Sequence, residues 1–266
     1  MYTTLTTLID RLDSTAISGT NVIRWGCPVP SFGDLSSSQV ATIGLNPSNR
    51  EFVDEAGNEL QGALRRFHTL GSLRLKSWSE VDSRHLRLIM ESCQSYFRGN
   101  PYDRWFKRLD QVVAGTKASY YNPLNGACHL DLIPFATVHK WMDLTTMQRS
   151  SLLAVAGDTL GLLLRDSSVR IIILNGRSVV QQFQDVAGVI LERQEMPTWS
   201  LARRSNTNVM GVGYRGIVDT MSGIVLGRKI LVLGFNHNIQ SSFGVTTKVI
   251  QEIRSWIAEE SKDTIQ

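Results

Sequence analysis

Short apolar runs alternate along the chain with longer amphipathic segments. Four runs are expected to be buried strands because loop-forming residues bound each of them; they cover residues 39–45, 129–135, 169–174 and 230–235. Apolar residues at helical spacing predict helices over residues 83–97, 102–113, 145–164, 178–186 and 246–259. Strands that alternate with helices are typical of a parallel sheet covered on both faces. The pattern therefore predicts one α/β domain that spans residues 1–266.

Each predicted strand ends in polar residues that are common in turns. Asn46-Pro47-Ser48 follows the first run, Asp131 lies in the second, Asn175 follows the third, and Asn236-His237-Asn238 follows the fourth. In open α/β proteins the carboxyl ends of parallel strands share one edge of the sheet, and ligands bind at that edge. We therefore expect these side chains to converge on one crevice.

The sequence GVGYRG, Gly211–Gly216, matches the dinucleotide-binding fingerprint in its letters but not in its context. That fingerprint needs a strand before it, a helix after it and an acidic residue about 20 positions later. Here residues 217–218 and 224–226, with a turn at Gly227-Arg228, indicate hairpins that lead into the last predicted strand. We therefore expect no nucleotide cofactor, and nothing in the sequence indicates another cofactor.

Charge and apolar content narrow the choice of partner and compartment. Lys and Arg (28) exceed Asp and Glu (24) by four, which hints at a polyanionic partner. The chain has neither a secretory signal at its start nor the ~20 apolar residues that span a bilayer, so we expect a cytoplasmic protein, with no membrane contact, that acts as a monomer. Basic residues that form either a phosphate-binding face or solvated surface are Arg65, Arg66, Arg104, Lys107, Arg108, Arg177, Arg203 and Arg204.

Cysteine and histidine spacing argues against a metal site. The three cysteines are far apart and odd in number, so no disulfide framework or four-cysteine cluster is expected. No pair of histidines has the spacing of zinc ligands. Cys128 lies beside His129, but neighbours on a strand point to opposite faces, so we expect Cys128 to be a buried structural residue.

The segments around Asn46 and His237 are the strongest functional candidates. An asparagine amide both donates and accepts, so Asn46 can hold a water or the edge of a heterocycle, although Asn-Pro is also a common turn pair. His237 directly follows the last predicted strand. It either serves the crevice or only caps the turn.

The residues GLNPS (44–48) and HNIQSS (237–242) resemble the two motifs of the uracil-DNA glycosylase superfamily. In that family a motif of the form Gly-hydrophobic-Asp/Asn-Pro follows the first strand, and a motif centred on a histidine follows the last. The order, the separation and the strand–loop context agree. The resemblance implies a three-layer α/β/α fold with a central four-stranded parallel sheet, to which hairpins are added, and an enzyme that excises a base from DNA.

The resemblance also assigns roles to single residues. It implies that Asn46 positions the attacking water, that His237 stabilises charge on the departing base, and that Asp131 lies where the family reads the base's polar edge. A carboxylate that takes the water's proton is expected among Glu51, Asp54 and Asp131. The other residues expected at the base are Ser48, Glu51, Phe52 (which would stack on it), Asn236 and Asn238, and those expected on the DNA are Arg65, Arg66, Arg177, Gln240, Ser241 and Ser242.

The sequence departs from the family pattern at informative positions. Asn46 replaces the aspartate of the most active uracil enzymes, and no proline follows His237. The four cysteines of the iron–sulfur branches are absent. Ser48 stands where strict uracil enzymes carry a bulky aromatic residue that excludes C5-substituted pyrimidines. The resemblance therefore implies a pocket that accepts modified pyrimidines.

These features predict a monofunctional DNA glycosylase, in repair or anti-phage defence, that flips out a pyrimidine and leaves an abasic site. A C5-substituted or hypermodified cytosine of phage DNA is a better candidate than plain uracil. No lysine lies in either motif, so no lyase step is expected. Two alternatives stay open, which are a non-catalytic binder of nucleic acid or damaged bases on the same fold, and an N-glycosidase of free nucleosides or nucleotides.

Overall fold

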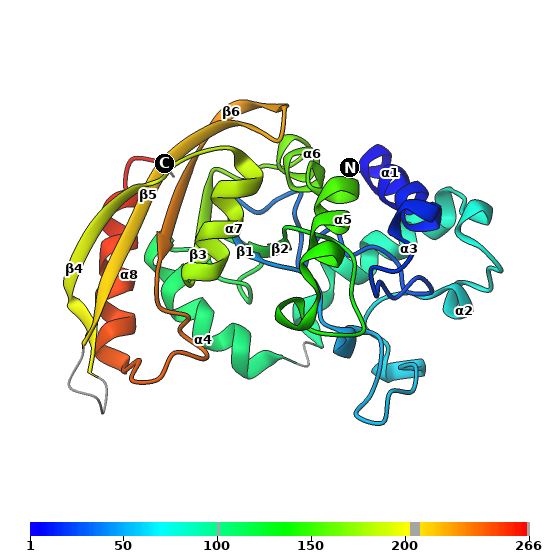
Figure 1. Cartoon of the computed structure of the whole chain (residues 1–266), viewed down its shortest axis with the longest axis horizontal. Coiled ribbons are helices and arrows are strands. Elements are labelled where there is room, and N and C mark those ends of the chain that lie inside the picture. The colour runs from blue at the N-terminus through cyan, green and yellow to red at the C-terminus, as the bar shows by residue number, and fades with distance from the viewer. Residues whose placement is uncertain (100–101, 203–207, 265–266) are drawn as a thin grey trace.

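The computed structural model describes residues 1–99, 102–202 and 208–264 and places helices on both sides of one sheet (Figure 1). Arg203 and Arg204 lie outside the described residues. The helices are α1 (Tyr2–Asp13), α2 (Leu70–Leu73), α3 (Ser83–Gln94), α4 (Asp103–Val113), α5 (Thr146–Ala156), α6 (Thr159–Arg165), α7 (Arg177–Ala187) and α8 (Thr247–Ser261). The strands are β1 (Val40–Gly44), β2 (Ala127–Asp131), β3 (Ile171–Asn175), β4 (Glu192–Leu201), β5 (Val209–Met221) and β6 (Ile224–Phe235).

The sheet is six-stranded and mixed, with the order β2-β1-β3-β6-β5-β4. The four strands predicted from the apolar runs are parallel to one another, since β1 pairs with β2 and β3, and β3 pairs with β6. The expectation of a four-stranded sheet is wrong, because β5 and β4 extend it in antiparallel pairing beyond β6. The turn before β6 lies at Ser222-Gly223 rather than at Gly227-Arg228, so β6 runs unbroken through Gly227. Figure 1 shows these long strands curving past α8.

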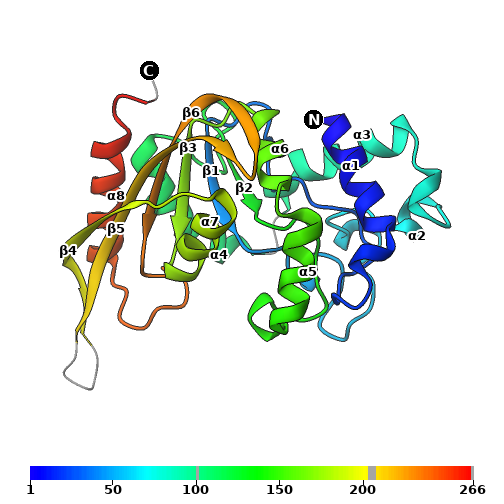
Figure 2. The ribbon, with the colours of Figure 1, turned by 45° about the horizontal axis from the view of Figure 1, so that its top comes forward.

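Two apolar clusters cover the two faces of the sheet. Alternate residues of β3 divide between them: Ile172 and Leu174 pack with α6 and α7, whereas Ile171 and Ile173 pack with α4 and α8. This alternation follows from the pleat of a strand, whose side chains point to opposite faces in turn. Figure 2 shows the sheet between α7 and α8. The α/β class and the helix layers on both faces thus follow from the apolar pattern.

The predicted helix over residues 145–164 is two helices, α5 and α6. They separate at Gly157-Asp158, and both carboxylate oxygens of Asp158 accept hydrogen bonds from Arg11 Nη1 and Nη2, at 2.5 and 2.8 Å. Arg11 belongs to α1, a helix that the sequence analysis did not predict. Leu5, Leu8, Ile9 and Leu12 of α1 are buried, as expected for an amphipathic helix on a core.

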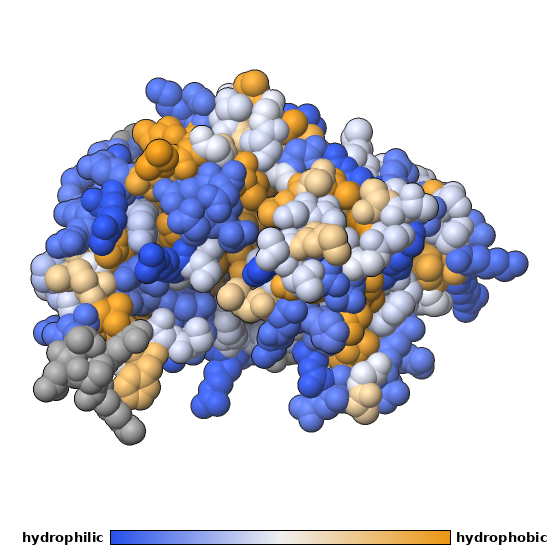
Figure 3. All heavy atoms as spheres, in the orientation of Figure 1, coloured by the Kyte–Doolittle hydropathy of each residue, from blue (hydrophilic) through white to orange (hydrophobic). Residues whose placement is uncertain are grey.

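Among the described residues, no helix is both long and apolar enough to cross a membrane. On the face drawn in Figure 3, hydrophobic residues form small groups between hydrophilic ones. Scattered exposed apolar side chains of this kind are normal for a folded protein in water.

Candidate functional site

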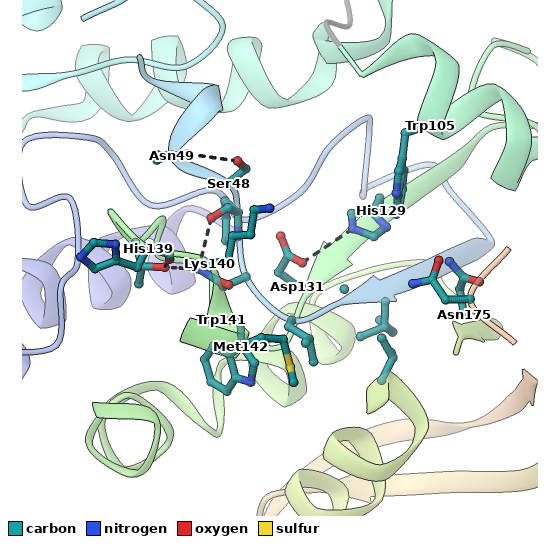
Figure 4. A pocket seen from close by; sticks show the side chains of 18 residues that line it. Ser48, Asn49, Trp105, His129, Asp131, His139, Lys140, Trp141, Met142 and Asn175 are labelled. Carbon is teal, nitrogen blue, oxygen red and sulfur yellow. Dashed lines mark hydrogen bonds and ion pairs between the residues drawn. The ribbon is translucent and has the colours of Figure 1, made fainter. Parts of the chain in front are cut away.

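A crevice of about 320 Å³ opens at the carboxyl ends of β1, β2 and β3, within the size range of small-molecule sites. Four of the predicted site residues line it, namely Asn46, Ser48, Asp131 and Asn238. Asn175, which follows the third predicted strand, lines it as well. The polar and aromatic side chains that complete the lining are Asn49, Trp105, His129, Thr137, His139, Lys140 and Trp141. Figure 4 shows Asp131 between Ser48 and Lys140 on one side and Asn175 on the other. Polar residues at the carboxyl ends of β1, β2 and β3 therefore meet at one crevice, as expected from the parallel sheet.

Gly44, the last residue of β1, makes room for the polar side chains of β2. Gly44 pairs with Asp131, and Thr42 pairs with His129, so all four positions share one face of the sheet. A Cβ on Gly44 would stand 2.2 Å from Asp131 Oδ1 and 2.8 Å from His129 Nε2. Only a residue without a side chain fits beside this histidine–carboxylate pair.

His129 connects the crevice to a buried chain of hydroxyl groups. Its Nδ1 lies 2.7 Å from Thr42 Oγ1, which lies 2.6 Å from the hydroxyl of Tyr120. The rings of Trp105 and Phe106 meet the imidazole edge-on. No role for His129 was predicted from the sequence. Its spacing of two from Asp131 places both side chains on one face of the strand, and this spacing could have identified His129 as a site residue.

Its neighbour Cys128 points the other way, as expected. The thiol is fully buried among apolar side chains on the opposite face of the sheet. Burial raises the pKa of Cys128 to about 12, so the sulfur stays protonated and is a poor nucleophile at neutral pH. The prediction of a structural cysteine is confirmed.

Asp131 is a buried carboxylate without a hydrogen-bond donor of its own. Its side chain is 4% exposed, and Oδ1 lies 3.6 Å from His129 Nε2 (Figure 4). Within the parts of the chain that the structure describes, no group donates a hydrogen bond to either carboxylate oxygen. A ligand that brings N–H or O–H groups into the crevice can donate hydrogen bonds to these oxygens.

The amide of Asn46 is held in one orientation. Its Nδ2 lies 3.1 Å from the Pro47 carbonyl, 3.3 Å from the Phe135 carbonyl and 2.8 Å from Thr137 Oγ1. Carbonyl oxygens only accept, so the nitrogen must face them. The amide oxygen is therefore the group that Asn46 can offer to a water or a ligand.

The amide of Asn238 is held in the opposite orientation, with its oxygen rather than its nitrogen bound by the protein. Its Oδ1 accepts hydrogen bonds from the backbone N–H groups of Gln240 and Ser241, at 3.0 and 3.1 Å. The amide nitrogen is thus the polar end left for the crevice. Asn175 and Gln240 stiffen the same loop, because Asn175 Nδ2 donates to Gln240 Oε1 and Gln240 Nε2 donates to the Trp105 carbonyl. Gln240, predicted to bind DNA, is engaged within the protein.

The structure does not bring His237, Asn236 or Phe52 to the crevice. His237 is buried, and its Nε2 lies 2.8 Å from the Trp199 carbonyl, so this nitrogen donates to the backbone. Burial lowers the pKa of His237, which keeps the ring neutral. Asn236 bonds the backbone of β5 at Met210 and Val212. Phe52 is buried in the aromatic core and does not reach the crevice. The aromatic side chains that line the crevice are those of Trp105 and Trp141.

The predicted DNA-contacting side chains lie outside the crevice lining. Arg177 is exposed at the first position of α7, two residues after Asn175. Ser241 is exposed and Ser242 is partly buried on the loop after β6. Arg65 is exposed, whereas Arg66 is partly buried and donates to the Arg50 carbonyl.

Two of the three carboxylates considered as bases are unsuited to that task. Asp54 is exposed, and it caps its own turn by accepting hydrogen bonds from the backbone N–H groups of Ala56 and Asn58. Glu51 is buried behind Ser48, where its Oε1 accepts from the Tyr96 hydroxyl at 2.9 Å while Oε2 has no partner. Burial raises the pKa of Glu51 to about 8, so this carboxyl group is protonated at neutral pH. Asp131 is the one of the three that lines the crevice.

Glu51→Gln is expected to remove a pH dependence of stability. The free energy of unfolding of the wild type should fall as the pH rises from about 4.5 to about 8, because the folded state holds a proton that the unfolded state has released. The maximum slope is about 1.4 kcal/mol per pH unit. Urea unfolding between pH 5 and 8 measures it. Glu55→Gln, at an exposed position, is the control and should keep the wild-type slope; equal slopes for wild type and Glu51→Gln would contradict the prediction.

Among the described residues, no cluster of three or more His, Cys, Asp or Glu side chains is arranged to hold a metal ion. The crevice offers a buried carboxylate, two oriented amides, two tryptophans and the basic side chains of His129, His139 and Lys140 as its own chemistry. A comparison with known protein families finds no family model that matches this chain, and no curated protein matches it either.

Proposed function

We propose that the chain is a monofunctional DNA glycosylase that extrudes a C5-substituted pyrimidine bearing an exocyclic amino group, such as a modified cytosine, hydrolyses its N-glycosidic bond and leaves an abasic site. In this proposal it acts as a cytoplasmic monomer on host or phage DNA. The observation that carries the proposal is the Asp131 carboxylate, buried in a crevice at the sheet edge and without a donor from the described protein.

Asp131 selects the base by a carboxylate that lies 3.6 Å from His129 and accepts no hydrogen bond from the described protein. The exocyclic amino group of cytosine donates hydrogen bonds, and a carboxylate is the group that accepts them best. Uracil and thymine carry a carbonyl oxygen at that position, which would meet the carboxylate as a second acceptor. Ser48 adds space at the crevice, and its small side chain leaves room for a substituent at C5.

The oriented amides of Asn46 and Asn238 have different catalytic roles. Cleavage of the N-glycosidic bond builds positive charge on the sugar and negative charge on the base. Asn238 Nδ2 donates to the base oxygen on which that charge develops, the role first expected of His237. Asn46 Oδ1 accepts a hydrogen bond from the attacking water and orients it below the sugar. The C1′–N1 bond breaks as the C1′–O bond forms, and the proton that the water releases ends on the departing base. Trp105 and Trp141 offset the few kcal/mol that base extrusion costs by packing on the flipped base.

One observation favours a second candidate function, a binding module for nucleic acid on the same fold. Glu51 is protonated and Asp54 caps its own turn, so a crevice whose Asp131 is engaged by the base holds no further carboxylate among those considered. A base would then be bound without a carboxylate that deprotonates the water. The two functions differ in whether free base is released.

The test is mass spectrometry of the bases released from duplex and single-stranded DNA that contains uracil, thymine, 5-methylcytosine, 5-hydroxymethylcytosine or glucosylated cytosine. We expect release of an amino-bearing, C5-substituted base and formation of abasic sites without strand cleavage. Asn46→Ala should lower the rate on the order of 10-fold, because the water loses its orientation while the base is still bound.

Asn125→Ala is the matched control, since Asn125 also donates to a backbone carbonyl, that of Lys117, but lies near the start of β2. It should release base at the wild-type rate. Tight binding without release from any DNA would favour the binding module. Release from free nucleosides and not from DNA would favour a nucleoside N-glycosidase.

A further inference from the structure

A basic groove runs beside the crevice, between α4 and the start of α8. It has a volume of about 800 Å³. One wall is the face of α4 that carries Arg104, Lys107, Arg108 and Gln111, which repeat at the spacing of one helix face. The other wall is formed by Val245, Thr246, Thr247 and Ile250.

Basic side chains outnumber acidic ones in the lining of this groove. Asp103 is the one carboxylate in its lining, and it pairs with Lys107 at 2.5 Å. Arg108 Nη2 donates to the Val245 carbonyl at 3.2 Å, which neutralises no charge. Arg104 is exposed, and within the described chain no carboxylate forms an ion pair with it. The groove therefore presents a net positive charge and suits a polyanion.

Helix α4 contributes to both the groove and the wall of the crevice. Trp105, next to Arg104 on α4, lines the crevice, and its carbonyl accepts from Gln240 on the loop that leads to Val245. The stripe from Arg104 to Gln111 is about 10 Å long at the rise of an α-helix. That length matches about three nucleotides of one strand. A strand with a nucleotide in the crevice can thus continue along α4.

We propose that the groove between α4 and α8 is the track for the phosphodiester backbone of the DNA strand whose base enters the crevice. This inference rests on the proposed function for its choice of strand. Arg104 and Lys107 contact phosphates from their exposed positions, and Arg108 holds the two walls together while it adds charge. Phosphate contacts of this kind fix register and orientation and carry no sequence information.

The test compares the double variant Arg104→Gln/Lys107→Gln with Arg170→Gln/Lys229→Gln, which removes the same charge from exposed positions at the opposite edge of the sheet. Fluorescence anisotropy with a labelled single-stranded oligonucleotide gives Kd over a range of salt concentrations. We expect the groove variant to weaken binding about 10-fold and to lower the salt slope by about 1.4, the value for two lost contacts on a single strand. The control should bind as the wild type does.

Base release measured at saturating DNA separates the two proposals. If the wild type releases base but the groove variant binds as tightly as the control, the groove inference is overturned and the proposed function stands. If no base is released but binding depends on the groove, the inference stands and the enzyme proposal fails. Equal binding of poly-L-glutamate, with the same dependence on Arg104 and Lys107, would overturn nucleic acid as the occupant.

Discussion

Asp131→Asn is expected to turn the base preference of the crevice from amino-bearing to carbonyl-bearing pyrimidines. In the wild type, the Asp131 carboxylate and the carbonyl oxygen of uracil are both acceptors and repel each other. The amide nitrogen of an asparagine at position 131 can instead donate a hydrogen bond to that carbonyl oxygen. Each such contact discriminates by about 1–3 kcal/mol, so release of 5-hydroxymethylcytosine should fall by about 10- to 100-fold and release of 5-hydroxymethyluracil should rise. Single-turnover rates on paired oligonucleotides that differ only in this base measure the change.

The same variant separates the two roles open to Asp131. If the carboxylate took the proton from the water, Asp131→Asn would lower release of both bases by the same factor. Asp166→Asn serves as the control for lost stability, because Asp166 accepts from the amino terminus and from Thr4 Oγ1 at 2.9 and 2.6 Å and does not line the crevice. It should lower the melting temperature and leave the ratio of the two rates unchanged.

The edge of the sheet that carries the site could be predicted because strand ends are readable in sequence. Buried runs that stop at Asn46 and Asn175, and one that contains Asp131, identified the three parallel strands whose ends border the crevice. Parallel pairing then placed these residues together without any knowledge of the contacts between them. The extra strands were harder to predict. β5 and β4 carry exposed side chains along much of their length, so their pattern predicts hairpins but not that they continue the same sheet.

The direction of a side chain after a strand could not be predicted. His237 and Asn238 are adjacent, yet the first turns inward to the Trp199 carbonyl and the second faces the crevice. The choice depends on β4, whose partner strand and position were not predicted. Phe52 likewise follows a short helical turn that sends its ring into the aromatic core. His129 was missed for another reason, since it was considered only as a neighbour of Cys128 and not as a residue two positions before Asp131 on the same strand.

Gly44→Ala is expected to lower the rate of base release strongly, because the added methyl group collides with Asp131 and His129. The backbone of Gly44 does not need a glycine, because its φ lies outside the positive range, so the effect is purely steric. The new Cβ would overlap Asp131 Oδ1 and crowd His129 Nε2, and both side chains must move. A displacement of about 1 Å typically costs 100-fold in rate, so we expect base release to fall at least about 100-fold. Quenched-flow or gel assays of abasic-site formation measure it.

Gly126→Ala is the matched control for Gly44→Ala, because Gly126 lies just before β2 and its Cβ would meet the Asn122 carbonyl at 3.6 Å and Ser38 Oγ at 3.7 Å, both ordinary contacts. It should keep the wild-type rate. Overpacking at Gly44 should also lower the free energy of unfolding by about 1–3 kcal/mol, and thermal unfolding shows whether the variant is still folded at the assay temperature. A folded Gly44→Ala variant that releases base at the wild-type rate would show that the catalytic geometry does not depend on the close approach of Asp131 and His129 to β1.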